Sequence, residues 1–178
     1  MTESKTFTWI KDPSIPRTYG FLISPKLTAK VKRKGIWSPD GSAEIGARKL
    51  RFVSNGKANM HMTIFDGDSE KELGKLDFYW KDFQHSTLKL TDGNTYTFRS
   101  HDIIRGVWSW LKQDTPDKQF IFRIDNPLQR SGTIENQSKD ISALERDILL
   151  ALGLHLQQYI NNWMMTITLV VIAVVTGR

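Results

Sequence analysis

Hydrophobic and polar residues alternate along most of the chain between residues 5 and 135. Leu76, Phe78 and Trp80, for example, are separated by Asp77 and Tyr79. Successive side chains of a β-strand point to opposite faces, so this period of two is typical of strands with one buried face. The same period occurs in residues 6–9, 60–64, 87–91 and 119–124.

Turn sequences separate these alternating segments. They combine Gly, Pro, Asn, Asp and Ser, which tight turns favour. The turn sequences are PDG at 39–41, SNG at 54–56, FDGD at 65–68, TDGN at 91–94 and DTPD at 114–117. About ten short strands joined by tight turns predict an antiparallel meander.

A helical pattern replaces the alternation after the strands. Ser142 followed by Glu145 is the signature of a capping box at a helix N-terminus. An apolar stripe at helical spacing follows, with Asp147, Gln158 and Asn162 off the stripe. The stripe consists of Leu149, Leu152, Leu156, Ile160 and Trp163. We therefore expect one helix after the strands.

The last apolar run, residues 163–175, contains no charged residue. These thirteen residues would cover about 20 Å as a helix, whereas a membrane-spanning helix needs about 20 apolar residues. Eight of the ten residues 166–175 are β-branched, which favours a strand, although a helix enclosed by apolar groups tolerates them. Residues 163–178 are therefore expected to extend the core helix, to pair as a strand or to enter a membrane, with QQYINN at 157–162 as a candidate break.

The number of predicted strands indicates where the helix packs. A closed sheet of ten or more strands encloses more space than its own side chains fill, and a helix that is apolar on every side can occupy it. We therefore expect a mainly β fold, a closed antiparallel barrel of about ten to twelve strands formed by residues 1–140. The hydrophobic helical segment 141–178 should pack inside it. Trp108 and Trp110 share one strand face and are expected to fill the core.

Composition places the chain among globular proteins. It has 178 residues, of which 39% are hydrophobic and 25% charged, and this suits one domain with a sizeable core. The absence of cysteine excludes disulfides and thiolate sites and fits a reducing compartment. The first twenty residues show no basic region followed by an apolar run. We therefore expect no signal peptide and a cytoplasmic location.

No catalytic motif is recognisable in the sequence. It contains no GxSxG elbow, no Gly-rich phosphate loop and no HExxH pair. His61, His85, His101 and His155 are scattered, and we expect them at surface or capping positions. The sequence therefore predicts no enzyme, no cofactor and no metal site. A barrel enzyme that uses His61 or His101 is a minor alternative, which requires a carboxylate within hydrogen-bonding reach in a pocket.

The charge of the chain is concentrated near its start. The net charge is +6, and residues 1–50 carry the whole excess. Four lysines in this part alternate with Leu27, Ala29 and Val31, which would place four ammonium groups on one outer strand face. The predicted basic residues are Lys26, Lys30, Lys32 and Lys34, with Arg48, Lys49 and Arg51 on a nearby strand.

Two interpretations of this basic surface remain open. An anionic membrane attracts each such residue by roughly 1 kcal/mol, so the surface is a candidate site for anionic lipid. Alternatively, the lysines belong to a solvated strand and discourage edge-to-edge aggregation. Nucleic acid is not expected, because no outward aromatics for base stacking are interleaved with the lysines.

The layout of about a dozen antiparallel strands followed by a hydrophobic helix resembles the tubby-like superfamily. That group includes the tubby C-terminal domain, the LURP-one-related proteins and the phospholipid scramblases. The resemblance also includes KELGKLDFYWKDFQHSTLKLTDGNTYTF at 71–98 and ERDILLALGL at 145–154. It implies a closed barrel around a buried helix, with lipid or membrane association and no settled enzymatic activity.

Two details limit what the resemblance implies. Tubby domains bind phosphoinositides through basic residues, and only residues 26–34 and 48–51 offer a comparable group here. The cysteine-rich and calcium-binding segments of scramblases are absent, so lipid scrambling is not expected. The sequence thus predicts a non-enzymatic, cytoplasmic domain that binds anionic lipid surfaces or a protein partner. The alternative is a tail-anchored membrane protein that displays a cytoplasmic β-domain.

Overall fold

The fold is that of a computed structural model. It describes residues 5–24, 27–35, 38–55, 60–78, 85–103, 105–113, 115, 117–126, 130–139 and 141–176.

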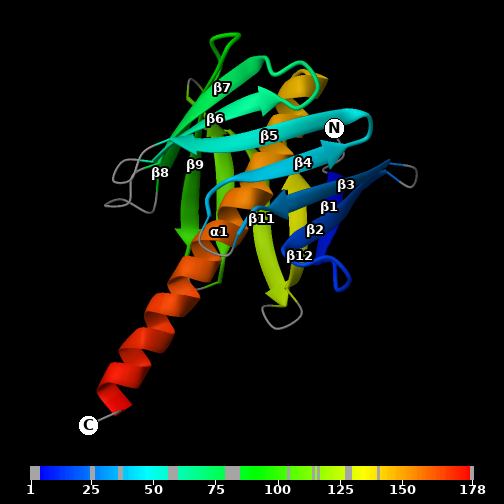
Figure 1. Ribbon diagram of the computed structural model, residues 1–178. Coiled ribbons are helices and arrows are strands. Elements are labelled where there is room, and N and C mark those ends of the chain that lie inside the picture. Colours follow the sequence, from blue (N-terminus) through cyan, green and yellow to red (C-terminus); the bar gives the residue numbers. More distant parts are fainter. Residues whose placement is uncertain are drawn as a thin grey trace.

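Twelve antiparallel strands form a closed barrel around a single helix (Figure 1). Each strand pairs with the next one in the chain, and β1 pairs with β12 to close the sheet. The predicted antiparallel barrel is therefore confirmed. The elements are β1 (Lys5–Lys11), β2 (Thr18–Ser24), β3 (Leu27–Arg33), β4 (Gly41–Ile45), β5 (Arg48–Asn55), β6 (Met60–Asp66), β7 (Glu72–Phe78), β8 (His85–Leu90), β9 (Thr95–Asp102), β10 (Val107–Lys112), β11 (Lys118–Asn126), β12 (Ser131–Asn136) and α1 (Ala143–Thr176).

Every second side chain of a strand points into the barrel and fills the space next to its wall. In β9, Tyr96 and Phe98 are fully buried while Arg99 between Phe98 and Ser100 is exposed. Phe98 stacks on Trp108 of the neighbouring strand, with ring centroids 5.2 Å apart. Trp108 and Trp110 are both buried, which confirms their expected place in the core.

The helix α1 fills the rest of the barrel. Every residue from 147 to 160 is buried, so the helix is enclosed on all sides. Asp147 and Gln158, which lie off the apolar stripe, are buried as well. The expected capping box is present: the Glu145 amide donates to Ser142 Oγ at 3.1 Å, and the Ser142 amide donates to Glu145 Oε2 at 2.8 Å.

The helix does not break at residues 157–162 but continues to Thr176. Figure 1 shows that it enters the barrel at one end and leaves it at the other, so that its last turns project beyond the strands. The expectation that residues 163–178 pair as a strand is therefore wrong for residues 163–176. In the described part of the chain, no helix is both long and apolar enough to cross a membrane.

Polar contacts fix the helix within the barrel at several heights. Near its start, Glu145 Oε1 accepts hydrogen bonds from Tyr96 and from Asn94, each at 2.8 Å. Further along, the Trp110 indole donates to the Leu149 carbonyl at 2.8 Å, and the Gln157 amide donates to the Gly106 carbonyl at 2.8 Å. These contacts define an entry end of the barrel beside Asn94 and an exit end beside Gly106.

One helical glycine allows the helix to approach the wall closely. A Cβ atom on Gly153 would lie 2.3 Å from Phe122 Cζ and 2.7 Å from Trp110 Nε1. Both rings belong to the buried core. Gly153 therefore sits where any larger residue would collide with aromatic side chains that have little room to move.

We predict that Gly153→Ala destabilises the protein, although alanine is the better helix former. Overpacking of a filled core costs about 1–3 kcal/mol, which outweighs the gain of about 1 kcal/mol in helix propensity. Because the added Cβ would lie 2.3 Å from Phe122 Cζ, the overpacking cost should be near the upper end of this range, so the net loss is about 2 kcal/mol and thermal unfolding should shift down by roughly 4–8 °C. Gly20→Ala is the control, because its Cβ would lie 3.7 Å from the nearest atom. An unchanged unfolding temperature for Gly153→Ala would contradict the packing described.

His155 is the clearest departure from the sequence-based expectations. It was expected at a surface or capping position but is completely buried on α1. Its Nε2 lies 2.6 Å from the Pro39 carbonyl, which can only accept, so Nε2 carries the proton. Nδ1 is buried and has no hydrogen-bond partner. Burial therefore lowers the pKa of His155 to about 4, and the ring is neutral in the folded protein.

We predict an acid-dependent loss of stability that originates at His155. Its folded pKa lies below the ordinary value of 6.5, so the unfolded chain binds the extra proton as the pH falls from 6.5 to 4. The stabilisation is complete above pH 6.5 and decreases by about 3 kcal/mol down to pH 4. Denaturant unfolding of the native protein and of His155→Gln at pH 7 and pH 4 measures this difference. Equal losses in the two proteins would contradict it.

Candidate functional site

The basic face of β3 is arranged as the alternation predicts. Lys30, Lys32 and Lys34 are exposed, while Ala29 and Val31 are buried in the core. The remaining predicted lysine, Lys26, lies outside the described residues.

Three of the predicted cations form ion pairs with carboxylates of nearby turns. The Lys34 ammonium is 3.6 Å from Asp40, and the Lys49 ammonium is 3.0 Å from Asp68. Arg51 pairs with Glu70. The Lys49 and Arg51 pairs are largely exposed to solvent, where an ion pair contributes at most about 1 kcal/mol. An anionic surface can therefore compete with them.

Arg48 has a different role from the other predicted cations. Its guanidinium donates to Asp147 at 2.5 Å and to the Ala143 carbonyl at 3.2 Å. Asp147 is only 7% exposed. Arg48 thus ties the first turn of α1 to the β4–β5 turn. We interpret it as a structural residue of the entry end.

Lys30 and Lys32 differ from the other described predicted cations in having no carboxylate within ion-pair distance in the described part of the chain. On the neighbouring strands Lys30 lies opposite Gly20 and Glu44, and Lys32 opposite Thr18 and Ser42. Two adjacent outward positions of β3 therefore present positive charge to solvent.

Three arginines at the exit end were not singled out from the sequence. Arg17 and Arg130 occupy turns in the left-handed region, with φ of 60° and 51°. The Arg33 amide donates to the Arg17 carbonyl at 3.1 Å, and the Lys11 amide donates to the Arg130 carbonyl at 3.0 Å. Positive φ is uncommon for a residue other than glycine, so the chain holds these two arginines in specific tight turns.

Arg33 lies inside the mouth of the barrel. It is 1% exposed, and its guanidinium is 5.2 Å from the Tyr159 ring centroid on α1. Burial is the main cause of its lowered pKa, and the charges of Arg130 and Arg17 lower it further. A signal for this position exists in the sequence, because Arg33 has the same strand parity as the buried residues Ala29 and Val31.

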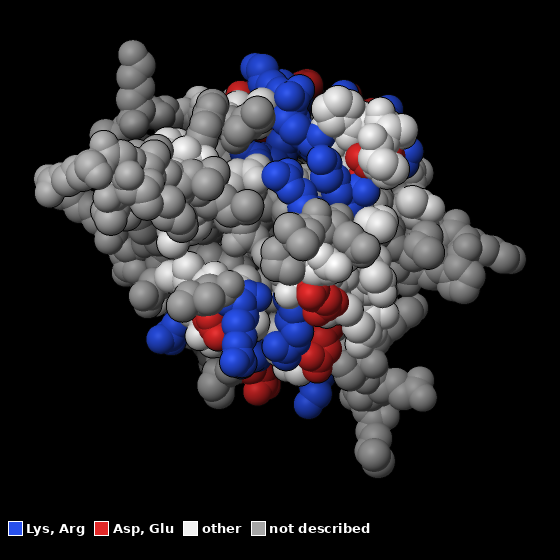
Figure 2. All heavy atoms as spheres, turned by 90° about the horizontal axis from the view of Figure 1, so that it is seen from below, with Lys and Arg blue, Asp and Glu red and all other residues white. Residues whose placement is uncertain are grey.

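Cationic side chains gather on the exit end of the barrel (Figure 2). Figure 2 views the molecule from this end and shows Lys and Arg side chains in two groups, one of which lies among acidic side chains. The other group has few acidic neighbours in this view. Cations and the last turns of α1 therefore meet at the same end of the barrel.

The two histidines considered for catalysis make hydrogen bonds on the barrel wall. His61 Nδ1 lies 2.7 Å from Asp77 Oδ1, with the imidazole 57% exposed. His101 Nε2 lies 2.6 Å from Ser109 Oγ, and burial is the first cause of the lowered pKa of His101. Ser109 is fully buried. Each pair joins two neighbouring strands of the wall, β6 to β7 for His61 and β9 to β10 for His101.

Among the described residues, no three His, Cys, Asp or Glu side chains lie close enough together to hold a metal ion.

Comparison with protein-family models, curated proteins and solved structures finds no match to this chain. The resemblance to the tubby-like superfamily therefore stays a prediction.

Proposed function

We propose that this protein is a non-enzymatic barrel domain that associates with anionic membrane surfaces through its exit end. The observation that carries the proposal is the path of α1, which continues past the barrel that it fills. The segment that projects has the sequence TITLVVIAVV at residues 166–175. The tubby-like resemblance supports the same class of function.

The apolar sequence of the projecting helix supports insertion into lipid. Residues 147–160 are enclosed by strands, whereas Figure 1 shows no strand beside the last turns of the helix. Transfer of one Val, Leu or Ile side chain out of water is favourable by about 1.5–3 kcal/mol. Residues 165–176 extend about 18 Å as a helix, more than half of a hydrocarbon core of about 30 Å. This length is sufficient to enter one leaflet.

The cations of the exit end support the anionic character of the membrane. Arg17 and Arg130 lie at the end from which the helix emerges, and Lys30 and Lys32 project from β3. Each cation close to an anionic leaflet contributes roughly 1 kcal/mol at physiological salt. Insertion of the helix would bring the arginines to headgroup depth.

Two alternatives use the same helix differently. A tail that spans the bilayer would make the protein tail-anchored, with the barrel displayed on the cytoplasmic side. A protein partner with an apolar groove would also cover the projecting helix. Binding to lipid vesicles distinguishes the two membrane models from the model with a protein partner. Extraction of cell membranes with alkaline carbonate then distinguishes a tail that spans the bilayer from one that inserts into a single leaflet.

We predict that a chain ending at Met164 folds normally and no longer binds vesicles. The residues removed lie beyond the barrel, so thermal unfolding should change by no more than a few degrees (Figure 1). Co-sedimentation with vesicles of phosphatidylcholine and phosphatidylserine measures the binding. Full-length Leu169→Asn/Ile172→Asn is a second variant that should bind weakly without any truncation. Undiminished binding by both variants would refute the role of the helix.

We also predict that the cations of the exit end make the binding depend on anionic lipid. Arg17→Gln/Arg130→Gln should weaken binding to vesicles that contain phosphatidylserine by up to roughly 30-fold, and Lys30→Gln/Lys32→Gln by a similar or smaller factor. The loss should shrink at high salt. The matched control is Lys71→Gln/Lys89→Gln, which removes the same charge from exposed lysines on the β6–β7 turn and β8. Equal effects of all three double variants would contradict a directed contact.

A further inference from the structure

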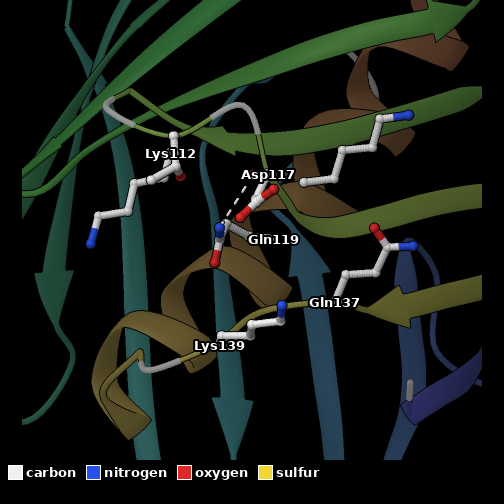
Figure 3. A pocket seen from close by; sticks show the side chains of 7 residues that line it. Lys112, Asp117, Gln119, Gln137 and Lys139 are labelled. Atoms are coloured by element: carbon white, nitrogen blue, oxygen red, sulfur yellow. Dashed lines mark hydrogen bonds between the residues drawn. The ribbon is translucent and has the colours of Figure 1, made fainter. Parts of the chain in front are cut away.

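A polar pocket opens at the entry end of the barrel (Figure 3). It lies between the β10–β11 turn and the link from β12 to α1, and its volume is about 470 Å³. That volume is within the usual range for small-molecule sites, about 300–1,000 Å³. The lining residues are Lys112, Thr115, Asp117, Lys118, Gln119, Gln137 and Lys139.

The pocket carries a surplus of positive charge. Three of its lining residues are lysines and only one, Asp117, is acidic. In the part of the chain that the structure describes, these lysines form no ion pair with a carboxylate. Lys112 and Lys118 are half-buried, which reduces the screening of their charge by water. A small anion would therefore be attracted to this pocket.

Gln119 adds a directional group to the charge. Gln119 is 5% exposed as a whole residue, and its Nε2 donates to the Asp117 carbonyl at 3.2 Å. This bond orients the amide, and Oε1 is left buried without a hydrogen-bond partner. Figure 3 shows the amide between Lys112 on one side and Gln137 and Lys139 on the other. Buried acceptors are rarely left unpaired, so we expect a hydrogen-bond donor to bind at Gln119 Oε1.

The backbone around Gln119 is held firmly. The Gln137 amide donates to the Gln119 carbonyl at 2.9 Å, which joins the two walls of the pocket. The last side-chain torsion of glutamine is broad, so a small rotation can turn Oε1 toward a donor while Nε2 keeps its bond to the Asp117 carbonyl. The pocket therefore combines a fixed frame with one adjustable acceptor.

We propose that this pocket binds a small soluble phosphate ester that carries a hydroxyl group next to the phosphate. The phosphate lies among Lys112, Lys118 and Lys139, and the hydroxyl donates to Gln119 Oε1. Asp117 disfavours a second anionic group and accepts a hydrogen bond from a further hydroxyl. Glycerol 3-phosphate is the simplest molecule with this chemistry.

The position of the pocket favours a free metabolite over a lipid headgroup. The pocket is at the entry end, whereas α1 emerges from the opposite end of the barrel (Figure 1). If the emerging helix inserts into a membrane, the pocket faces away from it. The site involves none of the residues of the exit end, so only the choice of a soluble ligand over a lipid headgroup rests on the proposed membrane association.

The test is titration of the full-length protein with glycerol 3-phosphate, inorganic phosphate and glycerol, followed by calorimetry and by NMR of the pocket amides. Glycerol 3-phosphate should bind more tightly than inorganic phosphate, and glycerol should not bind measurably. Gln119→Met keeps the shape of the side chain but removes the acceptor, and it should weaken binding of glycerol 3-phosphate about fivefold to tenfold. The affinity of Gln119→Met for inorganic phosphate should stay unchanged.

Charge variants complete the test. Lys112→Gln/Lys118→Gln should weaken both phosphate ligands strongly, whereas the control Lys71→Gln/Lys89→Gln should not. Thermal unfolding without ligand verifies that each variant folds. Vesicles that contain phosphatidylglycerol serve as the lipid arm, and protection of the pocket amides by these vesicles but not by free glycerol 3-phosphate would overturn the proposal of a soluble ligand. Absence of binding by glycerol 3-phosphate, or equal binding by all variants, would overturn the site itself.

Discussion

Everything in this protein depends on the filling of a closed twelve-stranded barrel by a helix from the same chain. A barrel of this size cannot be filled by the side chains of its own wall. The segment 147–160 supplies the missing volume and is buried on every side. Close packing leaves so little room that the helix needs a glycine at residue 153, where it meets Phe122 and Trp110. The buried helix also decides where the remaining turns go, because a straight helix that fills the barrel must leave at the other end.

The polar residues inside the barrel give that helix a defined height and rotation. Apolar contacts alone allow a helix in a wide barrel to slide or turn at small cost, whereas a buried hydrogen bond is lost at once by such a shift. Glu145, Trp110 and Gln157 form such bonds at successive levels. His155 adds a further bond near the exit but has one unpaired nitrogen. His155 therefore helps to position the helix, and its protonation at low pH would weaken that position.

Much of this fold could be predicted from the sequence, and the physical reasons for success and failure differ. Period-two alternation and the capping box at Ser142 are local signals, so the strands and the start of the helix follow from them directly. The environment of an inward polar residue is not local: Arg33 has the parity of a core position, yet only the assembled mouth of the barrel shows what surrounds it. Ion pairs such as Lys49 with Asp68 join residues nineteen positions apart through the register of β5 and β6. The pocket beside Gln119 likewise requires two distant turns to be adjacent.

The order of the elements along the chain has a consequence for how the protein is made. All twelve strands leave the ribosome before the helix that fills them, and β1 must wait for β12 before the sheet can close. Until then the inner face of a nearly complete sheet and its two free edges are accessible, which is the state most prone to strand addition by other chains. Contacts between α1 and β3 join residues that are more than a hundred positions apart, so folding requires the closure of long loops and should be slow. A nascent chain of this protein is therefore expected to need a chaperone that covers apolar sheet surface until the helix has been synthesised.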